Sequence, residues 1–211
     1  MNHYLIFAVG FLAQILFSAR QITQWISSEK AGKILSPLLF WQLSIVASFL
    51  MIFYGLLRSD LAIVLGQAIT YGIYLRNLHY HGFWKKIPLI FRYPAILFPL
   101  GAGIWLITGG AQDLTHLFSN KEISGPLMIW GISGQFVFTF RFIYQWIYCE
   151  KRKESLLPVG FPLISVCGSF MVLSYAIIRR DPVLFVGQLF GCIVYSRNIL
   201  IWHKQNRALS S

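Results

Sequence analysis

The chain has 211 residues, of which 56% are hydrophobic and 12% charged, and its formal net charge is +11 at pH 7. Soluble domains carry roughly a quarter charged residues, so this composition excludes an ordinary soluble domain and indicates a protein that crosses a membrane several times. Most of the basic residues lie in short loops between apolar segments. This distribution is typical of membrane topology and not of a nucleic-acid-binding surface.

Seven segments are long and apolar enough to be membrane-spanning helices. In chain order they are residues 4–26, 37–57, 61–80, 87–109, 125–148, 157–178 and 182–202. The fourth segment contains Pro88, Pro94 and Pro99. Proline removes a backbone hydrogen bond inside a helix, so we expect this fourth helix to be kinked and to act as a spacer between the others.

An internal repeat organises these segments. Residues 10–78 align without a gap with residues 131–199, and 24 of the 69 positions are identical. Each copy holds three apolar segments, and the fourth segment restores a common orientation of the two copies. We therefore predict an all-α integral membrane protein in which two parallel three-helix repeats are joined by a linker helix. The predicted domains are residues 1–80, 81–124 and 125–203, followed by a cytoplasmic tail at 204–211.

The loops on the two sides of the predicted membrane differ in charge. One side carries fourteen of the lysines and arginines and the other side carries four. Because basic loops stay in the cytoplasm, this difference predicts an N-terminus outside and a C-terminus in the cytoplasm. The predicted location is the inner membrane of a bacterium.

Four arginines occupy equivalent positions in the two copies, namely Arg20 with Arg141 and Arg76 with Arg197. All four are predicted to lie in the cytoplasmic third of the membrane, where a charged side chain is costly and indicates a function. The guanidinium fork matches the geometry of a phosphate, so we expect these side chains to bind an anionic headgroup. The alternative is that they reach the membrane interface and have no ligand.

Uncharged polar side chains are repeated as well. A buried amide is costly unless it is paired, so these groups should face the interior of the helix bundle and line a path for the substrate. The alternative is that they hydrogen-bond one helix to another. The predicted path consists of Gln14, Gln24, Gln67, Tyr74 and Asn77 and their counterparts Gln135, Gln145, Gln188, Tyr195 and Asn198.

The predicted outer loops each carry an arginine and an aspartate at equivalent positions. These residues are Arg58 and Asp60 in the first copy and Arg179 and Asp181 in the second. We expect them to cap helix ends or to form an outer gate. None of the seven acidic residues is positioned in the sequence to activate a histidine, serine or cysteine nucleophile, and the three cysteines lack a metal-binding spacing. The sequence therefore favours a protein that is not an enzyme and has no catalytic residue, metal or cofactor.

The first copy contains the strings GFLAQILFSARQITQWISSEK, FW and LRSDLAIVLGQAITYGIYLRNL. In this pattern the chain resembles the lipid A biosynthesis N-terminal domain family. The second copy shows the same pattern. That family is similar in architecture to the PQ-loop and SWEET transporters, which have three-plus-one-plus-three helices and an external N-terminus. The resemblance implies handling of a lipid-linked sugar. Some members are fused to a lipid-A-disaccharide synthase, so we expect a synthase label to come from the fusion partner.

These features predict a translocator, similar to a flippase, for an anionic lipid-linked sugar or lipid A precursor. Two alternatives are a non-transporting membrane subunit that docks a glycosyltransferase acting on lipid A or a polyprenyl phosphate, and a SWEET-like transporter of small sugars. The expected partners are membrane lipids and a membrane-associated glycosyltransferase, with no nucleic acid.

Overall fold

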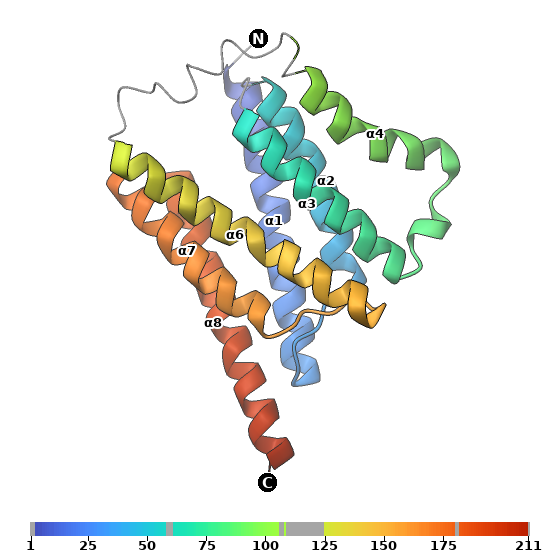
Figure 1. The fold of residues 1–211 in the computed structure, drawn as a ribbon, viewed down its shortest axis with the longest axis vertical. Coiled ribbons are helices and arrows are strands. Elements are labelled where there is room, and N and C mark those ends of the chain that lie inside the picture. Colours follow the sequence, from blue (N-terminus) through green and yellow to red (C-terminus); the bar gives the residue numbers. More distant parts are fainter. Residues whose placement is uncertain (1–2, 58–60, 106–107, 109–124, 180–181, 211) are drawn as a thin grey trace. The chain divides into compact units, whose positions relative to one another are not determined.

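The computed structural model describes residues 3–57, 61–105, 108, 125–179 and 182–210. Over these residues the chain forms seven α-helices and one short 3-10 helix, and contains no strand. In chain order they are α1 (His3–Ala31), α2 (Leu38–Leu57), α3 (Leu61–Tyr80), η1 (Trp84–Lys86), α4 (Leu89–Trp105), α6 (Gly125–Arg152), α7 (Gly160–Arg179) and α8 (Pro182–Ser210) (Figure 1). The prediction of an all-helical protein is confirmed.

The helices follow the apolar segments closely, and three of them extend further. α1, α6 and α8 continue beyond the predicted cytoplasmic ends of their apolar segments, because the charged and amide residues that follow are good helix formers. Most of the predicted tail therefore belongs to α8. α4 remains α-helical through Pro94 and Pro99.

Within the described part of the chain, two helices are apolar enough over a full span to cross a bilayer. They are α2 over Leu38–Leu57 and α7 over Gly160–Ile178, with mean hydropathies of 1.8 and 2.0. The sevenfold crossing and the sides on which the termini lie therefore remain predictions.

Two compact units divide the chain, and their limits fall inside helices. Unit 1 comprises Met1–Phe17 and Trp41–Lys121, and unit 2 comprises Ser18–Phe40 and Glu122–Ser211. The first part of α1 thus belongs to unit 1, and its remainder belongs to unit 2. The domain limits expected from the repeat are a separate prediction, which these units do not test.

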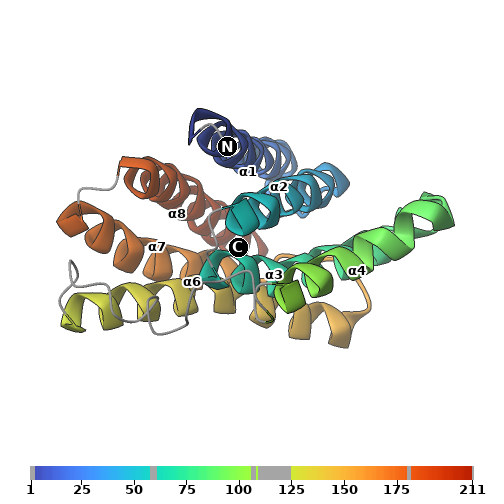
Figure 2. The same ribbon diagram turned by 90° about the horizontal axis from the view of Figure 1, so that it is seen from above.

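Unit 1 is held together by aromatic and aliphatic packing around α3. Ile52, Val64 and Tyr71 are buried with Ala102 of α4 in one hydrophobic cluster. The ring of Phe98 also packs on that of Phe49, with the ring centroids 4.4 Å apart. Figure 2 shows α4 beside α3. These contacts attach the linker helix to the first repeat.

In unit 2, α7 packs against both α6 and α8 (Figure 2). The close approach of α6 and α7 requires a glycine. A Cβ atom added to Gly168 would lie 2.8 Å from the Cα and N atoms of Phe138, which is shorter than any ordinary contact. Small residues at such crossings allow two helix backbones to meet, as is common in membrane proteins.

The first helix of each repeat ends in the same way. α1 ends at Ala31 and is followed by Gly32 with φ of 63°, and α6 ends at Arg152 and is followed by Lys153 with φ of 57°. A left-handed residue directly after the last turn is a common helix C-cap. Gly32 and Lys153 occupy equivalent positions in the repeat, so the two turns share their geometry.

A buried glutamine holds the turn after α1. Gln24 Nε2 donates to Ser28 Oγ at 3.0 Å and to the carbonyl oxygen of Leu35 at 3.3 Å. The backbone N–H of Leu35 in turn donates to Ser28 Oγ at 3.1 Å. These hydrogen bonds satisfy polar groups that would otherwise be buried without partners, and they fix the position of the turn.

The second copy repeats this arrangement with a cysteine in place of the serine. Gln145 Nε2 donates to Cys149 Sγ and to the carbonyl oxygen of Leu156, both at 3.0 Å, and the Leu156 N–H donates to Cys149 Sγ at 3.2 Å. Burial raises the pKa of the Cys149 thiol. The neutral thiol therefore takes the structural place of the Ser28 hydroxyl.

Candidate functional site

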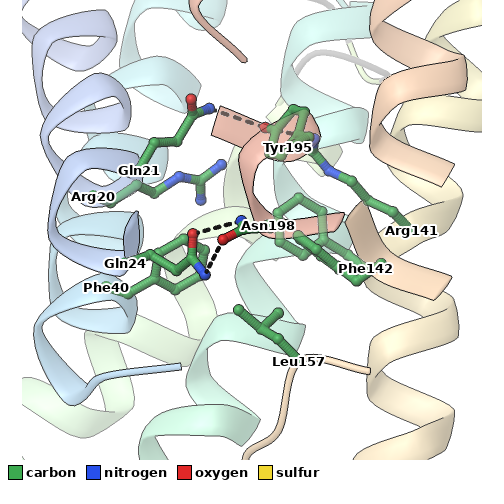
Figure 3. A pocket seen from close by; sticks show the side chains of 10 residues that line it. Arg20, Gln21, Gln24, Phe40, Arg141, Phe142, Leu157, Tyr195 and Asn198 are labelled. Atoms are coloured by element: carbon green, nitrogen blue, oxygen red, sulfur yellow. Dashed lines mark hydrogen bonds between the residues drawn. The ribbon is translucent and has the colours of Figure 1, made fainter. Parts of the chain in front are cut away.

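Unit 2 contains a small cavity lined by side chains of α1, α6 and α8, by the first turns of α2 and α7, and by Leu157 between α6 and α7 (Figure 3). Its volume of about 10 Å³ has room for the centre of roughly one water molecule. Among the described residues that line it are two guanidinium groups and no carboxylate. The lining residues are Arg20, Gln21, Gln24, Phe40, Arg141, Phe142, Leu157, Phe161, Tyr195 and Asn198.

The two arginines of the cavity are buried among aromatic rings. Arg20 is 5% exposed and Arg141 is 2% exposed. The guanidinium carbon of Arg141 lies 3.4 Å from the ring centroid of Phe138 and 4.7 Å from that of Phe142, and the guanidinium carbon of Arg20 lies 5.5 Å from the latter. Such contacts stabilise a buried cation. Both cations contact the Phe142 ring and line one cavity, and a lining with two guanidinium groups favours an anion.

Tyr195 links the arginine of α6 to the polar face of α1. Its hydroxyl oxygen accepts hydrogen bonds from Arg141 Nη1 at 2.8 Å and from Gln21 Nε2 at 3.0 Å (Figure 3). These two donors use both lone pairs of the phenol oxygen, so the hydroxyl proton remains for donation to an acceptor. Tyr195 is therefore a third donor, beside the two arginines, that an anion in the cavity can use.

Two buried amides connect α1 to α8 at the same level. Asn198 Nδ2 donates to Gln24 Oε1 at 2.9 Å, and Gln24 Nε2 donates to Asn198 Oδ1 at 3.3 Å (Figure 3). Both residues are buried, with exposures of 3% for Gln24 and 4% for Asn198. The reciprocal pair fixes the spacing of the two helices that present Arg20 and Tyr195.

Arg197, in contrast, lies outside the cavity in an ion pair. Its Nε donates to one carboxylate oxygen of Glu29, and its Nη2 donates to the other at 3.1 Å. The hydrogen bond from Arg197 lowers the pKa of Glu29 to about 2, and a hydrogen bond from Trp25 Nε1 acts in the same direction. The carboxylate is therefore ionised at neutral pH, and the pair joins α1 to α8 at an exposed position.

Arg76 is half-buried in unit 1, with its guanidinium carbon 4.8 Å from the ring centroid of Tyr80. The four repeated arginines thus fall into two pairs. Arg20 and Arg141 share the cavity, whereas Arg76 and Arg197 do not line it.

The cavity brings together three of the predicted path residues, Gln24, Tyr195 and Asn198. The others lie elsewhere. Tyr74 packs on the Trp41 ring, Asn77 donates to the Ile73 carbonyl oxygen, and Gln67 accepts a hydrogen bond from Ser48. Gln145 holds the turn after α6, Gln14 and Gln188 are half-buried, and Gln135 is exposed although its amide was expected to face the interior. Arg58, Asp60 and Asp181 lie outside the described residues, as does the side chain of Arg179.

Five lining residues were not predicted from the sequence. Phe142 and Leu157 gave no signal, because an aromatic or aliphatic residue in an apolar chain is expected at any depth. Phe40 and Phe161 occupy equivalent positions in the two copies and are identical, which is a signal that could have found them. Gln21 lies on the same helical face as Gln14 and Trp25, so helical spacing places it with other polar groups.

Comparisons with known proteins place these observations in a family. A family model described as "Lipid A Biosynthesis N-terminal domain" matches residues 9–79 and 130–200. The two matches fall on the two copies of the repeat and together cover most of the chain. No solved structure matches the chain.

Three curated relatives represent the similar proteins. The chain is 29% identical to a "Lipid-A-disaccharide synthase" of Chlamydia felis (strain Fe/C-56), over 97% of this chain and 34% of that protein. It is 28% identical to the protein of the same name from Chlamydia pneumoniae, over 97% of this chain and 35% of that protein. It is 26% identical to the protein of the same name from Chlamydia trachomatis serovar D, over 89% of this chain and 32% of that protein. The chain spans about a third of the length of these relatives.

These comparisons correct the functional prediction. A translocator is wrong, because the matching relatives are named as synthases and the matching family is a domain of lipid A biosynthesis, not of transport. The same finding removes the alternatives of a docking subunit and of a SWEET-like sugar transporter. It also gives no support to the prediction that the chain is not an enzyme. The sequence suited a transporter because it has repeated helices and buried polar groups. These features occur in transporters and in this family alike, so they do not distinguish the two.

Proposed function

Because this chain belongs to the lipid A biosynthesis N-terminal domain family, we propose that it is a membrane domain of lipid A disaccharide synthesis. In this role it binds the phosphate of an acylated sugar. The observation that supports this proposal best is the pair of buried guanidinium groups, Arg20 and Arg141, in one cavity. The setting is a bacterial membrane in which such a glycolipid is made.

The chemistry of the lining suits an anion. Arg20 and Arg141 supply charged donors, and the Tyr195 hydroxyl supplies a neutral one. Hydrogen bonds from charged donors to phosphate oxygens are among the strongest in proteins, and the arginine fork can contact two oxygens at once. The ten lining residues include no carboxylate or histidine that would serve as a general base. The cavity is therefore better suited to holding the substrate than to transferring the sugar.

The apolar surface supports a membrane setting for this role. Phe11, Ile15, Ile90, Phe136 and Phe170 are each more than half exposed. Large exposed apolar side chains on several helices are costly in water and favourable against lipid. We propose the arrangement expected from the repeat, with seven spans as two parallel three-helix repeats around a linker helix, an external N-terminus and a cytoplasmic C-terminus.

The size of the cavity sets a condition on binding. A phosphate group is larger than the one water molecule for which the cavity has room. The phosphate therefore enters only when side chains at the rim move apart. Phe40 and Phe142 lie on the guanidinium groups, so a change of their rotamers opens the way to the cations.

The test is a comparison of two lipids that differ only in the phosphate. The purified chain in phosphatidylcholine nanodiscs is titrated with acylated glucosamine 1-phosphate and with the same lipid lacking phosphate, and binding is measured by native mass spectrometry. We expect the phosphorylated lipid to bind at least about tenfold more tightly, equivalent to about 1.4 kcal/mol. Equal affinity for the two lipids would contradict the proposal.

A further inference from the structure

Equivalent positions of the two copies meet in the cavity, and one pair of them breaks the symmetry. Three such pairs line the cavity, of which two are identical in residue type and one is not. The pairs are Arg20 with Arg141, Phe40 with Phe161, and Gln21 with Phe142. The cavity therefore offers two alike cations but has a polar side chain at one position and an aromatic ring at its counterpart.

Gln21 has a hydrogen-bonding atom that the described part of the chain leaves unpaired. Its Nε2 donates to Tyr195, but its Oε1 is buried and has no hydrogen-bond partner among the residues that the structure describes. A buried acceptor without a partner is costly, so its presence beside a cavity calls for an explanation. A ligand that brings a hydroxyl or amide N–H beside its phosphate supplies the missing donor.

Phe142 offers the opposite surface. Its ring contacts the guanidinium groups of Arg20 and Arg141 and packs edge-to-face on Phe161, with the centroids 5.3 Å apart. A phenyl ring provides apolar contact and no hydrogen-bond donor from oxygen or nitrogen. The side of the cavity at Phe142 therefore favours the hydrocarbon part of a ligand. The side at Gln21 favours a sugar ring that carries hydroxyl groups.

We propose that Gln21 and Phe142 orient the ligand and select a glycolipid phosphate over a phosphate attached only to acyl chains. The phosphate contacts both arginines, the donor-bearing sugar lies at Gln21, and the hydrocarbon lies at Phe142. This inference rests on the proposed function, since it assigns the specificity of the same cavity. Gln21 is thus a specificity-determining residue and the arginine pair supplies general affinity for phosphate.

The experiment compares two anionic lipids in one protein and in two variants. Acylated glucosamine 1-phosphate and phosphatidic acid with matched chains are titrated into the wild type, Gln21→Met and Gln135→Met in phosphatidylcholine nanodiscs. Methionine keeps the length of glutamine without its amide, and Gln135 is exposed and does not line the cavity. We expect the wild type and Gln135→Met to prefer the glycolipid by roughly three- to tenfold, the contribution of one hydrogen bond.

For Gln21→Met we expect this preference to fall to within about twofold while phosphatidic acid binds as before. The inference is overturned if Gln21→Met retains the preference for the glycolipid. It is also overturned if Gln21→Met loses affinity for both lipids equally, because that result indicates that Gln21 has only a structural role. Equal binding of both lipids by the wild type also overturns it. If the wild type binds neither lipid, the proposed function itself fails, and the inference fails with it. Thermal melting of each variant establishes that it is folded.

Discussion

Replacing Arg20 and Arg141 together by glutamine is expected to weaken the binding of acylated glucosamine 1-phosphate at least about a hundredfold. A hydrogen bond to a charged group contributes about 1.5–3 kcal/mol, so the loss of two such donors exceeds two orders of magnitude. Glutamine keeps a polar side chain in each position and removes the buried charge. The measurement is the dissociation constant from a nanodisc titration followed by native mass spectrometry.

The other repeated arginines provide a matched control for this double variant. Arg76→Gln with Arg197→Gln removes the same charge from the same chain, but these two residues do not line the cavity. We expect this control to change the dissociation constant by less than about threefold, because charges outside the site act only through screened long-range fields. A loss in the control as large as that in the cavity variant would mean that general electrostatic attraction explains the binding.

Gln24→Leu is expected to lower the stability of the protein by about 2–4 kcal/mol. Gln24 is 3% exposed, and its amide bonds to Ser28, to the Leu35 carbonyl and to Asn198. Leucine has a similar volume but leaves these buried partners unsatisfied, which costs about 1–3 kcal/mol for each group not reached by water. For a chain of this size we expect a melting temperature roughly 5–15 °C lower, measured by thermal unfolding in detergent.

Gln135→Leu is the matched control, since it makes the same change at an exposed position of α6. Its melting temperature should stay within about 2 °C of the wild type, as is usual for surface substitutions. If Gln24→Leu is as stable as this control, the reciprocal amide pair does not hold α1 to α8.

The helices were predictable from the sequence because each apolar segment is bounded by charged or turn-forming residues. The segments expected at 37–57 and 61–80 became α2 (Leu38–Leu57) and α3 (Leu61–Tyr80) with almost no change. The ends of α1 and α8 were less predictable, because hydropathy locates the end of an apolar segment and not the end of the hydrogen-bonded helix. Strong helix formers carry the helix past that point.

The site was predictable only in its polar members, and Gln21 was not among those predicted. Arg20, Arg141 and Tyr195 were found because polar residues stand out in an apolar chain and recur in both copies. The repeat alone could not separate Arg20 from Arg197, which has an equally faithful counterpart in the first copy. That distinction depends on packing, since the carboxylate of Glu29 holds Arg197 at an exposed position.

The central claim is that one phosphate group lies against both buried arginines. An experimental density map of the chain with acylated glucosamine 1-phosphate in a nanodisc tests it most directly. We predict phosphate density within hydrogen-bond distance of Arg20, Arg141 and the Tyr195 hydroxyl, with the rings of Phe40 and Phe142 moved from the positions described above. Phosphate density elsewhere on the chain, with the cavity still closed over the two arginines, would contradict the claim.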